Sequence, residues 1–131
     1  MKKMMIKLLA VSMMIAGLAV ISFAQNSPEE IRFPQGKTRV NLKRTIKANG
    51  SIEFTFHAKK GQRVVLSANY DSDDSSDLDV AVTEPDSQDI SESGAANEPI
   101  EFNINTSGFH SVVVNNTTNR KITFDFGIYI K

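Results

Sequence analysis

The chain of 131 residues contains no cysteine and no tryptophan, and it has only two histidines. The lack of cysteine excludes a disulfide framework, a thiolate zinc site, a cysteine nucleophile and a lipid anchor on an N-terminal cysteine. Histidine is the side chain most often used for acid–base catalysis, so this chain carries few of the groups that enzymes need. A chain of this length holds one domain with a modest core. The composition therefore argues against a multidomain enzyme.

The first 24 residues have the pattern of a secretory signal peptide. Lysines precede an uncharged apolar run, and the small residues Ser22 and Ala24 form a cleavage site. We predict cleavage before Gln25, which leaves one domain of residues 25–131 in the periplasm or outside the cell. An uncleaved membrane anchor is the alternative, because the apolar run is at the short limit for spanning a bilayer.

Cleavage would also change the charge of the chain. The full sequence has 15 basic and 15 acidic residues, and the segment 1–24 holds three lysines and no acid, so residues 25–131 have 12 basic against 15 acidic residues, a net charge near −3. Nucleic acids and anionic membranes attract dense basic surfaces. We therefore expect neither of them as a partner, whereas a cationic protein partner is compatible with this charge.

Apolar residues recur at every second position in most of the chain after residue 38, which is the period of a β-strand with one buried face. No segment after residue 24 has three turns of helical spacing. Asn49-Gly50 predicts a tight turn that joins the first two strands as a hairpin, and residues 83–97, rich in Pro, Asp, Ser and Gly, predict a long loop. Residues 109–114 are apolar on both faces and predict a central strand. The expected inward residues are Val40, Leu42 and Ile46; Ile52, Phe54 and Phe56; Val64, Leu66 and Ala68; Leu78, Val80 and Val82; Ile100, Phe102 and Ile104; and Ile122, Phe124, Phe126, Ile128 and Ile130.

Short strands at this spacing predict an all-β fold, an antiparallel β-sandwich of jelly-roll type with seven or eight strands. One apolar face per strand suits two sheets packed face to face. The glycine and asparagine turns favour hairpin connections between neighbouring strands. Neither an internal repeat nor a second domain is visible in the sequence.

The acidic stretch 71–79 contains the candidate metal ligands Asp71, Asp73, Asp77 and Asp79. Calcium prefers several carboxylate oxygens, so these four aspartates predict a weak Ca²⁺ site. The stretch departs from an EF-hand loop at the required glycine and at the final glutamate. A solvated turn between strands is the alternative, because Asp and Ser side chains bind turn backbones. No other cofactor is indicated.

Catalytic motifs are missing from the sequence. No serine lies in a Gly-x-Ser-x-Gly or Ser-x-x-Lys motif. His57 and His110 lie 53 positions apart, and the alternation places His57 on the polar face of its strand. The four Asn-x-Ser/Thr sequons are interpreted as turn chemistry. We therefore expect a protein that is not an enzyme.

Several segments together resemble the pre-peptidase C-terminal domains of exported bacterial proteins. Residues 77–82, 97–98 and 107–114 follow that family's order of D-L-D-hydrophobic, N-E and S-G-x-Y-x-hydrophobic motifs. Residues 31–38 and 54–64 resemble the branch of the fold that contains periplasmic inhibitors of g-type lysozyme. The resemblance implies a small jelly-roll-like sandwich that binds and inhibits a lysozyme in the periplasm.

Several families of lysozyme inhibitor insert a Ser-Gly-x-Tyr loop into the enzyme cleft. The matching positions here are Ser107, Gly108, Phe109 and His110, so His110 replaces the tyrosine. The resemblance implies that Ser107 binds a catalytic carboxylate of the lysozyme, that Gly108 permits the turn, and that His110 donates a hydrogen bond in place of the phenol. A plain hairpin turn is the alternative for this loop.

The wider family leaves a second function open. Some of its members are accessory modules that bind carbohydrate or matrix, and here such a module would be stabilised by calcium at the four aspartates. Exposed aromatic platforms would favour this function, and the chain has no tryptophan and two tyrosines. A lysozyme inhibitor is therefore the first hypothesis and an accessory module is the second.

Overall fold

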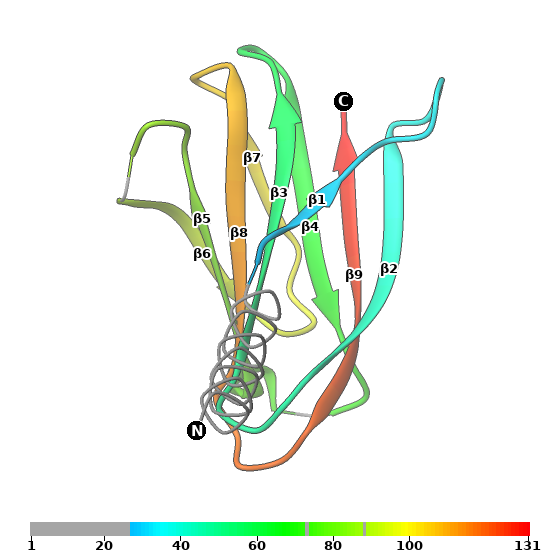
Figure 1. The fold of residues 1–131 in the computed structure, drawn as a ribbon, viewed down its shortest axis with the longest axis vertical. Helices are drawn as coiled ribbons and strands as arrows, with labels where there is room; N and C mark the ends of the chain where they lie inside the picture. The colour runs from blue at the N-terminus through cyan, green and yellow to red at the C-terminus, as the bar shows by residue number, and fades with distance from the viewer. Residues whose placement is uncertain (1–26, 73, 88) are drawn as a thin grey trace, which may run out of the picture.

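The computed structural model describes residues 27–72, 74–87 and 89–131, which form two β-sheets packed face to face (Figure 1). The five-stranded sheet has the order β1-β3-β8-β5-β6, and the four-stranded sheet has the order β2-β9-β4-β7. All neighbours are antiparallel except β1 and β3, which are parallel. The elements are β1 (Glu29–Ile31), β2 (Arg39–Ile46), β3 (Ser51–Ala58), β4 (Arg63–Asn69), the short 3-10 helix η1 (Ser75–Asp77), β5 (Leu78–Thr83), β6 (Ile90–Ala95), β7 (Ile100–Asn103), β8 (Gly108–Asn116) and β9 (Ile122–Ile130).

The predicted signal peptide, residues 1–24, lies outside the described residues. Within the described ranges, no helix is long and apolar enough to cross a membrane.

The predicted all-β sandwich is confirmed, and so are the inward faces of its strands. Along β9 the burial alternates from Ile122 to Ile130, as the sequence period requires. Phe54 on β3 and Phe126 on β9 stack across the two sheets, with ring centroids 4.4 Å apart and planes 10° from parallel. Phe102 and Phe124 are also buried. The core therefore lies between the sheets and is centred on aromatic contacts that join them.

Strand β8 occupies the centre of the five-stranded sheet, between β3 and β5, as predicted for residues 109–114. Its inward positions are buried and its outward Val113 is half-buried. The central position of this strand agrees with the prediction from its sequence.

The predicted hairpin between the first two long strands is wrong. Strand β2 pairs with β9 and strand β3 pairs with β8, so the two strands lie in different sheets. The tight turn itself forms, with Asn49 at a φ of 57° and the amide of Gly50 donating to the carbonyl of Lys47. This turn connects the two sheets. Turn residues determine the local reversal of the chain, but they do not determine which strands pair. Among the described strands, only β5 and β6 are consecutive in the chain and adjacent in a sheet.

The predicted long loop over 83–97 is also wrong, because it contains strand β6. Strand β6 pairs only with β5 and forms an edge of the five-stranded sheet. An edge strand is held by backbone hydrogen bonds and needs no apolar alternation, and native edges are often short and polar. Strand β1, at the other edge, is three residues long and also lacks apolar alternation. The described chain therefore has nine strands where seven or eight were predicted.

Asn116 joins the connections at one end of the sandwich. Its buried amide nitrogen donates to the carbonyls of Ile46, Lys47 and Arg120 at 3.2, 3.1 and 2.7 Å. Its amide oxygen accepts from the backbone N–H and the hydroxyl of Thr118. The sequon that begins at Asn116 is thus turn chemistry, as interpreted from the sequence.

Candidate functional site

The predicted binding loop lies at the end of the sandwich where the β3–β4 and β7–β8 connections and the C-terminus meet, uppermost in Figure 1. We call this surface, formed by residues 57–62, 104–110 and 131, the Phe109 end. Two backbone hydrogen bonds link its connections, from Gly61 N–H to Ile104 O at 2.9 Å and from Ile104 N–H to Gln62 O at 2.8 Å. The two connections therefore support each other as one unit.

Ser107 is exposed at the tip of the β7–β8 connection. Its Oγ accepts a hydrogen bond from the backbone N–H of Lys60 at 2.8 Å. A serine hydroxyl that accepts one bond still has its own O–H to donate. Ser107 thus braces the loop, and its own O–H remains able to donate a hydrogen bond.

Gly108 has a φ of +139°, a conformation that residues with a side chain rarely adopt. A Cβ at this position would lie 3.1 Å from the side chain of Pro85. Glycine is therefore required both by the backbone and by the close approach of the β5–β6 connection.

Phe109 is 54% exposed, although it is a large hydrophobic residue. It pairs with His57 in the register of β3 and β8, and the two rings meet edge to face with centroids 5.2 Å apart. Exposed Phe is unusual because leaving the ring in water forfeits the free energy of its burial. Phe109 is thus the large hydrophobic side chain that this end exposes to solvent.

His110 points the opposite way, into the core, where it is 1% exposed. Its ring stacks on Phe56 at 5.3 Å, and Nδ1 lies 3.1 Å from the carbonyl oxygen of Gly108. Its Nε2 has no hydrogen-bond partner among the described residues. Burial lowers the pKa of His110, and this outweighs the opposing effects of the Gly108 carbonyl and Glu84. His110 therefore packs beneath the loop and is not available at the surface, whereas Phe109 is exposed.

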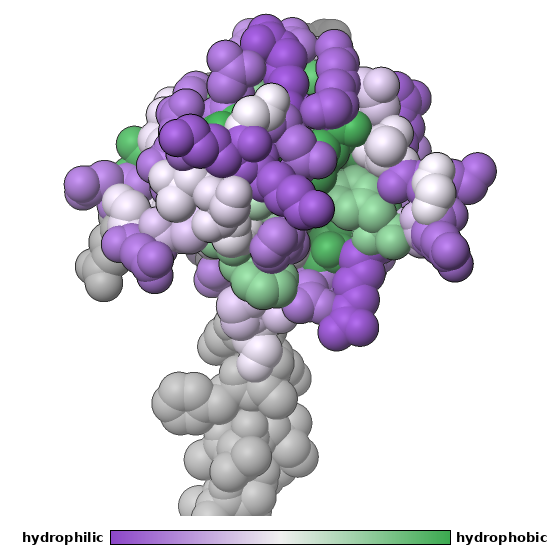
Figure 2. All heavy atoms as spheres, turned by 90° about the horizontal axis from the view of Figure 1, so that it is seen from above, coloured by the Kyte–Doolittle hydropathy of each residue, from purple (hydrophilic) through white to green (hydrophobic). Residues whose placement is uncertain are grey.

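Basic side chains lie beside His57 at this end of the sandwich. Lys37, Lys59, Lys131 and His57 line a hollow of about 270 Å³ at this end, and Lys60 follows in the same turn. Figure 2 views the molecule from above, onto this end, and shows a mostly hydrophilic surface broken by a few apolar residues. The Phe109 end is thus locally positive, although the sequence from residue 25 onward carries more acidic than basic residues.

The acidic stretch lies at the opposite end of the sandwich (Figure 1). Asp77 accepts hydrogen bonds from the hydroxyl of Tyr70 and, at 3.0 Å, from the guanidinium of Arg120. The Tyr70 hydrogen bond is the main reason that the pKa of Asp77 is lowered, and Arg120 adds to it. Asp77 thus serves the packing of the β4–β5 connection.

The other predicted calcium ligands are not gathered around Asp77 in the described chain. Asp71 and Asp79 are exposed, and Asp73 lies outside the described residues. Within the part that is described, no group of three His, Cys, Asp or Glu side chains is placed to hold a metal ion. The calcium site stays a prediction, since one of its four residues is not described.

The structure is that of a small β-sandwich protein. Its Phe109 end presents a loop that is held by hydrogen bonds and exposes one large apolar side chain. A sequence profile of the emp24/gp25L/p24 family/GOLD matches residues 31–131, so the chain belongs to that family. No curated protein sequence matches it.

Solved structures with this fold include periplasmic inhibitors of g-type lysozyme. PliG of Aeromonas hydrophila has a TM-score of 0.69 at 17% identity, covering 80% of this chain and 96% of PliG. PliG of Salmonella Typhimurium has a TM-score of 0.63 at 21% identity, covering 81% of this chain and 99% of its own. The pre-peptidase C-terminal domain of Bacillus anthracis collagenase has a TM-score of 0.60 at 15% identity and covers 81% and 96% of the two chains. At these identities the similarity establishes the fold.

Proposed function

We propose that this chain is an exported, non-catalytic protein that inhibits a lysozyme of g-type by inserting the Phe109 end into the enzyme's cleft. The observation that carries the proposal is the 54% exposure of Phe109 on a braced loop. Binding hot spots are large side chains that fill a pocket of the partner, and the contacts around them contribute little binding free energy and mainly exclude water. Phe109 is such an anchor.

The bracing of the loop favours tight binding. Ser107 bonds to the β3–β4 turn, and Gly108 fixes the backbone before β8. A loop that is already ordered loses little conformational entropy on binding. The Phe109 end therefore needs little rearrangement to enter a cleft.

The charge of the Phe109 end suits a glycosidase cleft. Glycoside hydrolases hold catalytic carboxyl groups on either side of the bond that they cleave. The free O–H of Ser107 and the ammonium groups of Lys59 and Lys60 can approach such carboxylates. The acidic residues elsewhere on the surface would at the same time attract a cationic enzyme.

The comparisons support this function without deciding it. The two PliG structures are matched over nearly their whole length, so the similarity covers the entire inhibitor fold. The predicted signal peptide would deliver the chain to the periplasm, where PliG acts according to its name.

The test is a cell-wall lysis assay with g-type, hen-type and invertebrate-type lysozymes. We expect inhibition of the g-type enzyme, and we expect Phe109→Ala to weaken it by about thirtyfold or more, because truncating a hot spot costs about 2 kcal/mol or more. The matched control is Ile90→Ala, which truncates an equally exposed apolar residue, 63% exposed on β6. This control should inhibit within about twofold of the wild type.

Two results would contradict the proposal. If Phe109→Ala inhibits as well as the wild type, the contact surface lies elsewhere. If the wild-type protein inhibits none of the three lysozyme types, the inhibitor function is wrong, and a carbohydrate- or matrix-binding accessory module becomes the better hypothesis.

A further inference from the structure

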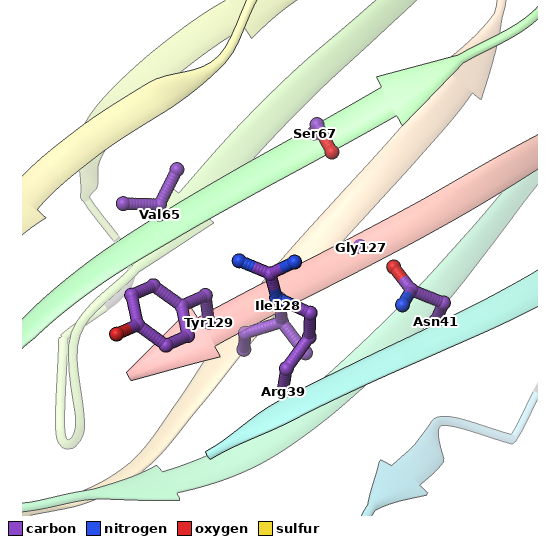
Figure 3. A pocket seen from close by; sticks show the side chains of 7 residues that line it. All are labelled: Arg39, Asn41, Val65, Ser67, Gly127, Ile128 and Tyr129. Atoms are coloured by element: carbon purple, nitrogen blue, oxygen red, sulfur yellow. The ribbon is translucent and has the colours of Figure 1, made fainter. Parts of the chain in front are cut away.

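The outer face of the four-stranded sheet carries a shallow hollow of about 230 Å³ (Figure 3). Its side chains come from three adjacent strands, β2, β9 and β4. Those that face the hollow are mainly polar: Arg39, Asn41 and Ser67, with Tyr129 at one side. A concave site with a few converging polar groups is a typical place for a small ligand.

The strand register builds this hollow in two rows. Asn41 and Ser67 both lie opposite Gly127, one on each side of β9. A Cβ on Gly127 would lie 3.0 Å from both Asn41 Oδ1 and Ser67 Oγ. Because Gly127 has no side chain, its backbone forms the floor of the hollow. The amide of Asn41 and the hydroxyl of Ser67 lie on either side of this floor.

Arg39 and Tyr129 form the second row. The guanidinium carbon of Arg39 lies 5.0 Å from the centroid of the Tyr129 ring, and Figure 3 shows the guanidinium reaching over β9 toward the hollow. Stacking on an aromatic ring orients a guanidinium and leaves its N–H groups free to bind a ligand. Among the described residues, Arg39 makes no ion pair.

The nearby acids are engaged by other cations. Asp125, in the next row of the sheet, lies 3.8 Å from the ammonium of Lys43. Glu101 pairs with Arg63 at 2.6 Å and with Lys131 at 3.4 Å. The guanidinium of Arg39 is thus the unopposed charge of the hollow, so the complementary ligand is an anion.

The polar side chains of the hollow have free hydrogen-bonding capacity. Within the described part of the chain, the side chains of Asn41 and Ser67 make no hydrogen bond to another residue. Together they offer a donor–acceptor amide and a donor–acceptor hydroxyl beside the guanidinium. This set matches a ligand that carries one carboxylate and several hydroxyl groups.

We propose that this hollow binds a carboxylate-bearing sugar unit, with the carboxylate on Arg39 and ring hydroxyls on Asn41 and Ser67. Guanidinium binds carboxylate through two parallel N–H···O bonds, which fixes both position and orientation. The C-terminus of a peptide fits less well, because a peptide also needs apolar surface for its side chains. Two aliphatic residues line the hollow, and Ile128 is buried in the core, which leaves Val65. This site lies on the outer face of the four-stranded sheet, and the proposal does not depend on lysozyme inhibition.

The test is an NMR titration of the protein with D-galacturonate and with N-acetylmuramate. D-Galactose and N-acetylglucosamine are the neutral counterparts, and acetate and a short peptide with a free C-terminus are the other controls. We expect the acidic sugars to shift the amide signals of Asn41, Ser67 and Gly127. Arg39→Ala should weaken their binding by about tenfold or more, because a hydrogen bond to a charged group contributes about 1.5–3 kcal/mol. Lys121→Ala removes an exposed charge outside the hollow and should change binding by less than about twofold.

A second variant keeps the test independent of folding. Gly127→Ala fills the floor of the hollow and is compatible with a strand, so the domain should fold while acidic sugars bind at least about threefold more weakly. Failure of both acidic sugars to bind, or equal binding of the neutral sugars, would overturn the proposal. So would acetate or the peptide binding as tightly as the acidic sugars, because the site would then recognise a carboxylate alone.

Discussion

Replacing Phe54 by alanine tests the arrangement of the core. Phe54 is fully buried on β3, and its ring stacks on Phe126 of the opposite sheet at 4.4 Å. Removing a buried Phe ring costs about 3–5 kcal/mol, through lost burial and the cavity that remains. For a domain of this size, that loss lowers the melting temperature by roughly 15–30 °C. Total stability of such domains is about 5–15 kcal/mol, so the variant lies near the limit of folding.

The assay is urea unfolding of the wild type, the two single variants Phe54→Ala and Phe126→Ala, and the double variant. A stacked pair contributes about 0.5–1.5 kcal/mol beyond its burial, so the double variant should lose less than the sum of the single losses. Phe109→Ala is the control, and its exposed ring should contribute less than about 1 kcal/mol. A loss below about 1 kcal/mol for Phe54→Ala would refute the assignment of the inward faces.

Two further predictions concern buried polar groups. The pKa of His110 is lowered by burial, so below about pH 6.5 the unfolded chain takes up a proton that the folded chain does not, and the free energy of unfolding falls as the pH falls. His110→Phe should remove this part of the slope between about pH 7.5 and 5.5 in urea unfolding, and an unchanged slope would show that the ring is not buried as described. Asn116→Ala should cost about 2–4 kcal/mol, because it leaves several buried backbone groups without partners; a thermal melt within about 2 °C of the wild type would contradict this.

The alternation of the sequence was enough to predict the sandwich and its core. From Ile122 to Ile130 each inward residue follows from the period of two, because a strand with one buried face has no other arrangement. The pairing of the strands was not predictable in the same way. Asn49-Gly50 makes the expected turn, yet β2 and β3 join different sheets, since the pairing depends on contacts between residues far apart in the chain.

The predicted binding loop remains a prediction, but the structure shows where its four residues lie. Residues 107–110 do form the exposed end of a connection, and Gly108 does need its special backbone conformation. The alternation that buries Val112 also places His110 inward and Phe109 outward. The Ser-Gly-x-Tyr motif assigns the contact with the lysozyme to its fourth position, which is His110 here. The alternation instead indicates that Phe109 is the exposed residue. The polar hollow at Gly127 left no trace in the sequence, since it arises from three strands brought together only by the fold.

The measurement that tests the account most directly is amide hydrogen exchange of this protein with and without a g-type lysozyme. The account predicts slower exchange on binding at residues 57–62 and 104–110, where the Phe109 end would enter the cleft. The four-stranded sheet around Gly127 should exchange at the same rate in both samples. Protection confined to other parts of the surface, or no change at any residue at saturating lysozyme, would contradict the claim that this end is an inhibitory surface.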